Sequence, residues 1–206
     1  MVSGNGLSLD IVGRGINAVG ESPGIMRFLV LSCSLSENSR SRRMAEVVRN
    51  DLDDAGEEVD FVDLRHHALP FCDGGAAYGD PAVAPIAERV KRADGIILAG
   101  PIYNYDYNAA AKNVVEMTGS GSWSGKVVGF IAAAGGQGSY LSVLPLANSL
   151  MADFRCVIVP RFVYADGSAF GDDGELDNEE VRERIRSLGV DLVGFTQGLA
   201  GVLENR

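Results

Sequence analysis

The chain has 206 residues, of which 46% are hydrophobic and 22% are charged, so it is long enough for one well-buried domain and too short for two comfortable ones. Its formal net charge of −10 at pH 7 argues against nucleic acid or an anionic membrane as a partner. The sequence has no membrane-length apolar run, no basic-then-apolar signal pattern at its start and no disulfide framework among its three cysteines, so we expect a cytoplasmic protein.

Residues 1–25 are rich in glycine and serine and have weak periodicity, which predicts a flexible N-terminal extension. No internal repeat or linker divides the rest of the chain. Residues 26–206 are therefore expected to form one domain, and the function is sought there.

A strand, a turn and a helix at the start of this domain organise the rest of the chain. A short apolar run ends at Leu31, residues 32–41 are mostly small and polar, and a helix with apolar spacing comes next. Hydroxyls, unpaired backbone N–H groups and the helix dipole together can hold a phosphate at such a turn. The arginines within residues 40–43 destabilise the first helical turn unless an anion lies there. We interpret the turn as a phosphate site, with an ordinary turn capped by Ser39 as the alternative.

Alternating strand and helix patterns continue through the middle of the chain. Residues 57–64 alternate as a second strand, and a long connection over residues 65–81 contains a histidine pair that we interpret as solvated. Residues 85–93 predict a short helix. Residues 95–100 are apolar without alternation, as expected for a strand at the centre of a parallel sheet.

The C-terminal half repeats the alternation. Helices are predicted from about residue 109 to 117, from the glycine-rich turn at 135–139 to about 151, and from Asp177, where Glu180 completes a capping box. The intervening strands are predicted at residues 126–134 and 156–159. Five strands alternating with five helices predict an α/β fold, a flavodoxin-like doubly wound five-stranded parallel sheet with helices on both faces.

Three loops are expected to meet at one edge of this sheet. Right-handed crossovers place the carboxyl ends of parallel strands together, so residues 32–41, 101–108 and 135–139 converge there. Ligands of such sheets bind at this edge, close to the point where the strand order reverses. The first loop suits a phosphate. The second and third suit a flat aromatic ring, because glycines let the backbone approach it closely.

Motifs in these loops resemble those of a known family. The pattern C-S-L-S-x-x-S-R-S at residues 33–41 resembles the G-S-x-R-x-x-S-x-S turn of the NADPH-dependent FMN reductases, a flavodoxin-like family that includes azo dye, quinone and chromate reductases. P-I-Y-N-x-x-x-N-x-x-A-K-N at 101–113 is similar to its P-x-Y-N-x-x-x-P-x-x-L-K-N signature. G-G-x-G at 135–138 and A-F-x-x-x-G-x-L at 169–176 match its later motifs, so the likeness runs from residue 27 to 206.

The resemblance implies FMN as cofactor and NADPH or NADH as co-substrate, with ping-pong hydride transfer through bound FMN to a small acceptor. That acceptor would be a quinone, an azo compound, free flavin or a metal oxyanion. The flavin carries the chemistry, so no catalytic side chain and no metal is named. The implied cofactor-binding residues are Ser34, Ser36, Ser39, Arg40, Ser41, Pro101, Ile102, Tyr103, Asn104, Gly135, Gly136, Gln137 and Gly138. The family also implies a homodimer, to which Tyr105, Tyr107 and Trp123 are candidate contributors.

Three positions depart from the family pattern. Cys33 replaces a glycine and Ser36 an arginine in the phosphate turn, which points to a lower phosphate affinity. Asn108 replaces the proline that shapes the second loop. These departures leave the acceptor open.

Two rival functions remain. A cysteine-dependent phosphatase using Cys33 would need five residues between its cysteine and arginine, whereas six separate Cys33 from Arg40. A flavodoxin-type electron carrier without turnover suits the acidic net charge, but the T-x-T-G-x-T phosphate loop typical of such carriers is absent from the sequence.

Overall fold

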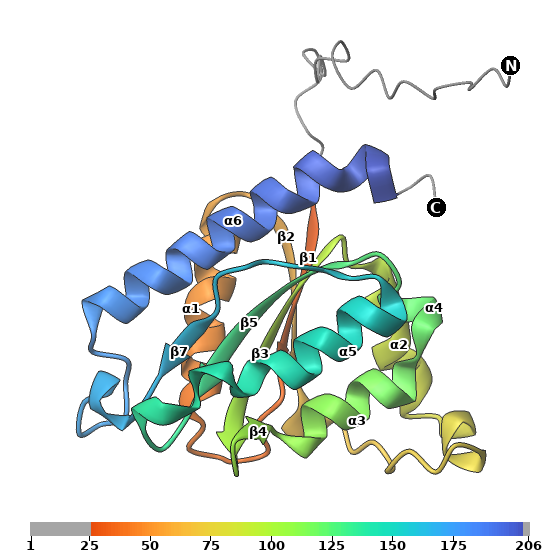
Figure 1. Ribbon diagram of the computed structural model, residues 1–206, viewed down its shortest axis with the longest axis horizontal. Coiled ribbons are helices and arrows are strands. Elements are labelled where there is room, and N and C mark those ends of the chain that lie inside the picture. Colours follow the sequence, from red (N-terminus) through yellow and green to blue (C-terminus); the bar gives the residue numbers. More distant parts are fainter. Residues whose placement is uncertain (1–25, 204–206) are drawn as a thin grey trace, which may run out of the picture.

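The computed structural model describes residues 26–203, and the extension predicted at residues 1–25 lies outside the described residues. At its centre is a sheet whose main strands run parallel, with helices on both faces (Figure 1). In order across the sheet these strands are β2 (Glu58–Asp63), β1 (Arg27–Ser32), β3 (Gly95–Tyr103), β5 (Val127–Ala133) and β6 (Val157–Ile158). This is the flavodoxin-like order, with its reversal between β1 and β3, so the fold predicted from the sequence is confirmed.

Two cores lie on the two faces of the sheet, because successive side chains along a strand point in opposite directions. In β1, Leu29 and Leu31 belong to one core, whereas Phe28 and Val30 belong to the other. The first core is covered by α2 (Val83–Arg92), α3 (Ala109–Thr118), α4 (Ser120–Trp123) and α5 (Leu144–Phe154), and the second by α1 (Arg40–Asp54) and α6 (Glu179–Leu203). Burial on both faces explains why the central strands are continuously apolar.

The far edge of the sheet differs from the single strand predicted at residues 156–159. β6 pairs with the beginning of β5, and a further strand, β7 (Val163–Ala165), pairs with its end. Pro160 lies between the two strands and has no N–H to continue the ladder. The proline therefore accounts for the interruption, and β7 brings its carboxyl end to the same edge as β5.

Several of the remaining connections contain 3₁₀ helices. The long connection after β2 contains η1 (Leu64–His66) and η2 (Ala76–Gly79), while η3 (Gln137–Val143) follows β5 and η4 (Gly167–Ala169) follows β7. None of the helices within residues 26–203 is long and apolar enough to cross a bilayer.

The last helix begins later than predicted. The side chain of Asn178, rather than Asp177, accepts the backbone N–H of Val181 at 3.0 Å, and Glu180 instead pairs with Arg184. Apolar side chains spaced three and four residues apart along this helix are buried at Val181, Ile185, Leu188 and Leu192. One turn further along α6, Phe195 is 38% exposed and Thr196 is 4% exposed. The helix has 3.6 residues per turn, so the buried position moves from 195 to 196.

Candidate functional site

A cleft of about 700 Å³ lies where the three predicted loops meet, at the carboxyl ends of β1, β3 and β5. The lining residues come from all three loops, so the convergence expected from the topology is observed. They are Ser34, Ser36, Asn38, Ser39, Arg40, Ser41, Pro101, Ile102, Tyr103, Asn104, Ala133, Ala134 and Gly135.

Buried hydroxyls organise the first loop. Ser39 is the N-cap of α1, as predicted, and its Oγ accepts the N–H of Arg42 at 3.1 Å. The same Oγ lies 3.1 Å from the Oγ of Ser41, and the backbone N–H of Ser36 donates to Ser34 Oγ. The N–H groups of Arg40 and Ser41 lie in the first turn of α1, where backbone N–H groups have no intrahelical acceptor. Hydroxyl-bearing residues and the N-terminus of α1 thus line one end of the cleft.

The three arginines of the first turn of α1 have different surroundings. Arg42 pairs with Glu46 at 2.5 Å, and Arg43 donates to the carbonyl of Gly174. Arg40 instead stacks over Phe170, with its guanidinium carbon 5.5 Å from the ring centroid, and it lines the cleft. The charge pattern alone did not distinguish the three arginines, and the family motif singled out Arg40. Of the three, only Arg40 lines the cleft.

The second loop is a tight hairpin. β3 runs to Tyr103, and β4 (Asp106–Tyr107) returns antiparallel to it. The two turn residues, Asn104 and Tyr105, have φ values of 52° and 63°, as a type I′ turn requires. A tyrosine rarely adopts this left-handed conformation. The turn leaves Tyr103, which lines the cleft, 56% exposed, and its neighbour Tyr105 74% exposed.

Buried polar side chains hold the second loop against the strands below it. The single O–H of Tyr107 is shared between the carbonyls of Leu98 and Ile131, which lie 2.9 and 2.8 Å from Oη. A Cβ at Gly100 would lie 2.7 Å from the Tyr107 ring and 2.7 Å from Asn108 Oδ1, so only glycine fits there. Burial raises the pKa of Tyr107, and its hydroxyl is committed to the backbone. Tyr107 therefore has a packing role here.

The third loop contributes less of the cleft than predicted. Ala133, Ala134 and Gly135 line it, while Gly136 and Gly138 do not and Gln137 begins η3. A Cβ added at Gly135 would meet nothing within 4 Å, so the glycine leaves space in the cleft rather than relieving a clash.

Three lining residues were missed by the sequence reasoning. Ala133 ends β5 and Ala134 follows it, and both look like ordinary core residues in the sequence. Asn38 lies between Ser36 and Ser39 in the first loop, at a position that the family motif leaves unspecified. Only the length of β5 could have indicated that its last residues reach the edge.

Cys33 does not face the cleft. It is fully buried, and its thiol donates to the carbonyl of Leu31 at 3.5 Å. Burial raises the pKa of the thiol, which keeps it protonated and non-nucleophilic. The geometry therefore does not favour the phosphatase alternative.

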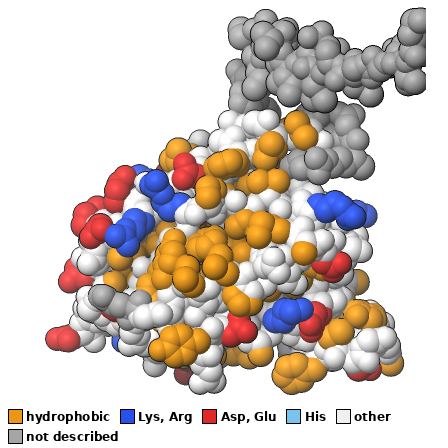
Figure 2. Space-filling model, viewed as in Figure 1, with side chains coloured by type: hydrophobic (Ala, Val, Ile, Leu, Met, Phe, Trp, Pro, Cys, Tyr) orange, Lys and Arg blue, Asp and Glu red, His pale blue; other side chains and the backbone are white. Residues whose placement is uncertain are grey.

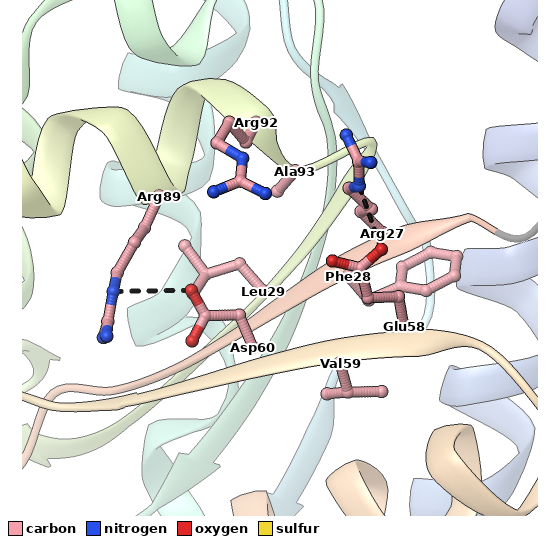
Figure 3. A pocket seen from close by; sticks show the side chains of 9 residues that line it. All are labelled: Arg27, Phe28, Leu29, Glu58, Val59, Asp60, Arg89, Arg92 and Ala93. Atoms are coloured by element: carbon pink, nitrogen blue, oxygen red, sulfur yellow. Dashed lines mark hydrogen bonds and ion pairs between the residues drawn. The ribbon is translucent and has the colours of Figure 1, made fainter.

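A second cavity, of about 270 Å³, lies at the opposite edge of the sheet (Figure 3). Its charged side chains are largely satisfied by one another, since Arg27 pairs with Glu58 at 3.0 Å and Arg89 with Asp60 at 3.5 Å. Within residues 26–203 no three His, Cys, Asp or Glu side chains gather as metal ligands. The cleft at the carboxyl edge is the stronger candidate.

Comparison with known proteins gives a consistent picture. The family model for NADPH-dependent FMN reductase matches residues 26–171. An NAD(P)H-dependent FAD/FMN reductase of Geobacillus thermodenitrificans is 29% identical, over 66% of this chain and 74% of the relative. An NAD(P)H:quinone oxidoreductase of Solanum tuberosum is 25% identical, over 87% and 97%. Among solved structures, the flavoenzyme NAD(P)H:(acceptor) oxidoreductase FerB of Paracoccus denitrificans superposes with a TM-score of 0.69 at 21% identity, covering 84% of this chain and 98% of FerB.

Proposed function

The chain belongs to the NADPH-dependent FMN reductase family, and we propose that its cleft holds FMN with the phosphate at the first loop and the ring between the second and third. Family membership makes the protein an FMN-dependent NAD(P)H oxidoreductase. The observation that carries the placement is the meeting of a hydroxyl-lined helix N-terminus with a glycine-opened loop in one cleft.

The first loop fits a phosphate. Ser34, Ser39 and Ser41 present nearly buried hydroxyls, and these can rotate from one another toward an anion. The N–H groups of Arg40 and Ser41 at the start of α1 add fixed donors, and the guanidinium of Arg40 adds formal charge. Ser36 stands where the family pattern has an arginine, so Arg40 carries more of the electrostatic attraction.

The ring end fits a flat heterocycle. Backbone from Pro101 to Asn104 forms one wall, and residues 133–135 form the other. Because Gly135 has no side chain, the backbone there can lie against a ring edge and donate or accept hydrogen bonds. Of the predicted residues in the third loop, only Gly135 is supported by the cleft geometry; Gly136, Gln137 and Gly138 stay predictions.

Bound FMN supplies the hydride chemistry that links NAD(P)H to a small acceptor. The chain binds and orients the cofactor and leaves one side of the cleft open beside Tyr103 and Tyr105. Nicotinamide and acceptor therefore occupy the same mouth in turn, which gives ping-pong kinetics. Among the described lining residues none is a histidine or a carboxylate, so we assign no side chain to proton transfer.

The relatives indicate the acceptor class. We propose quinones and azo compounds as acceptors, because similar proteins are named quinone oxidoreductase and azoreductase, with free flavin and metal oxyanions as further candidates. We also propose a cytoplasmic location, which the three free cysteines support. The test is steady NADPH oxidation by the FMN-loaded protein with a soluble quinone in excess. Sustained turnover with parallel double-reciprocal lines supports the proposal. Oxidation of one equivalent of NADPH followed by arrest would instead indicate an electron carrier.

A homodimer is proposed, with a different surface from the one expected. Tyr107 and Trp123 are buried within the subunit and cannot contribute, which leaves Tyr105 of the three predicted residues. Apolar side chains gather over α5 (Figure 2), where Leu144 and Met151 are exposed. Light scattering of the purified protein measures the mass directly, and a monomer at micromolar concentration would contradict the dimer.

A further inference from the structure

We propose that Asn108 sets the spacing between the two ends of the flavin site, because its side chain ties the first loop to the second. The residue lines neither the phosphate end nor the ring end of the cleft and acts as a positioning residue. The inference rests on the proposed placement of FMN in the cleft.

The side chain of Asn108 does not cap the helix that begins after it. Asn108 is the N-cap of α3, with φ −61° and ψ 147°, and asparagine at this position usually accepts an N–H of the first helical turn. Here it makes no such bond. Its Nδ2 instead donates to the carbonyl of Cys33 at 2.7 Å, across a separation of 75 residues, and the side chain is 5% exposed.

Backbone hydrogen bonds anchor both ends of this tie. The N–H of Asn108 donates to the carbonyl of Pro101 at 3.1 Å, which closes the base of the β3–β4 hairpin. The N–H of Cys33 donates to the carbonyl of Ala99 at 2.7 Å. The first loop therefore leaves the sheet at Cys33 with its N–H bound to β3 and its carbonyl bound to the start of α3.

The carboxamide oxygen of Asn108 indicates that the hydrogen bond to Cys33 fixes the orientation of the amide. Asn108 Oδ1 is buried without a hydrogen-bond partner among the described residues, and it sits over Gly100. An unpaired buried oxygen is unfavourable. Flipping the amide would place two oxygens against each other at Cys33, so the observed orientation is the one that keeps the loops together.

Proline, the residue of the family pattern at this position, could form neither hydrogen bond. It lacks the N–H that meets Pro101 and the side-chain donor that meets Cys33. The coupling of the two loops through position 108 is thus a property of this chain's asparagine. Ser34 follows Cys33 directly and lines the cleft, so a shift of the Cys33 carbonyl moves the phosphate end relative to Pro101 and Ile102.

Loss of the hydrogen bond between Asn108 and Cys33 should weaken binding of the phosphate and leave binding of the ring unchanged. FMN must reach both loops at once, whereas riboflavin has no phosphate and needs only the ring end. Loss of the tie should therefore lower affinity for FMN and leave affinity for riboflavin nearly unchanged. General damage to the fold would lower both.

The test compares Asn108→Leu with Asn113→Leu by flavin fluorescence titration. Asn113 is a matched control, a buried asparagine on the same helix whose Nδ2 donates to the carbonyl of Pro70 at 3.0 Å and whose Oδ1 accepts from Cys72 N at 3.0 Å. We expect Asn108→Leu to lower FMN affinity about tenfold, equivalent to about 1.4 kcal/mol, with less than about a twofold change for riboflavin. Asn113→Leu should leave the ratio of the two affinities unchanged.

Equal losses for both flavins in Asn108→Leu, or no loss for either, would overturn the inference. If Asn108→Leu does not fold, Asn108→Ser, which is too short to reach Cys33, is measured in its place against the same two ligands. A wild-type protein that binds FMN no better than riboflavin would instead refute the phosphate placement itself, so the two failures are distinguishable.

Discussion

The hydroxyl oxygens of Ser39 and Ser41 lie 3.1 Å apart at the N-terminus of α1, both almost completely buried. Ser39 also caps the helix through Arg42 N. One residue thus serves the fold and the proposed phosphate site together, and the two roles can be separated by substitution.

Ser39→Asp should keep the fold and lose the cofactor. Aspartate caps a helix about as well as serine, so the thermal midpoint should change little. Its carboxylate would face the FMN phosphate in a partly buried site, where like charges repel by a few kcal/mol, and roughly 2.7 kcal/mol is a hundredfold in affinity. Fluorescence titration measures the loss. A folded Ser39→Asp protein with normal FMN affinity would show that the phosphate lies elsewhere.

Arg40→Ala should weaken FMN binding by about tenfold or more, since a charge-assisted hydrogen bond to phosphate contributes about 1.5–3 kcal/mol. The matched control is Arg42→Ala. Arg42 sits in the same helical turn but pairs with Glu46, and such a pair contributes about 0.3–0.5 kcal/mol to stability. Arg42→Ala should leave FMN affinity within about twofold. Similar losses in the two variants would mean that only the net charge of the turn matters.

Two glycine substitutions should affect different properties, one the affinity for FMN and the other the stability of the fold. Gly135→Val adds a side chain where a Cβ meets nothing, so the protein without flavin should stay as stable as the wild type while FMN affinity falls. Gly100→Ala places a Cβ 2.7 Å from Tyr107 and Asn108, so it should lower stability by about 1–3 kcal/mol. Thermal melts with and without FMN separate the effects. Unchanged FMN binding in Gly135→Val would remove the third loop from the site.

Stability should fall at alkaline pH because of buried thiols. Burial raises the pKa of Cys156 to about 12 and also raises that of Cys33, whereas an unfolded thiol has a pKa near 8.5. The folded chain keeps protons that the unfolded chain releases, so this stability is present below about pH 8.5 and is lost as the pH rises further.

The measurement is urea denaturation between pH 8 and 10 for the wild type and Cys33→Ala. Removing one such thiol should reduce the slope of unfolding free energy against pH by an amount that approaches about 1.4 kcal/mol per unit toward pH 10, where the unfolded thiol is fully ionised. Identical slopes would mean that Cys33 is not buried as a protonated thiol. An aryl phosphatase activity that disappears in Cys33→Ser would likewise contradict its packing role.

Much of the fold was predictable because parallel strands buried on both faces must be apolar throughout. Residues 95–100 and 126–134 carried that signal, and the rule for the carboxyl edge then placed the loops together. Pro160 is plain in the sequence as a residue that can interrupt a strand. The strand β7 beyond it has only three residues, which is too short to show a pattern of alternating side chains.

The details of the site depended on contacts that no local pattern contains. The turn at Asn104 and Tyr105 lacks the glycine that usually marks a type I′ hairpin, so it was predicted only as a loop. The bond from Asn108 to Cys33 joins residues far apart in the chain and replaces an expected helix cap. Motif spacing identified Arg40. Only the structure shows that Arg42 and Arg43 have other roles, because Arg42 pairs with a carboxylate and Arg43 donates to a backbone carbonyl.

The central claim is that the first loop binds the phosphate of FMN, and a comparison of FMN with riboflavin on the wild-type protein tests it most directly. Both ligands carry the same ring, so the ratio of their dissociation constants, measured by flavin fluorescence at fixed ionic strength, isolates the phosphate. We predict that FMN binds about a hundredfold more tightly, equivalent to about 2.7 kcal/mol. Equal affinity for the two flavins would contradict the claim.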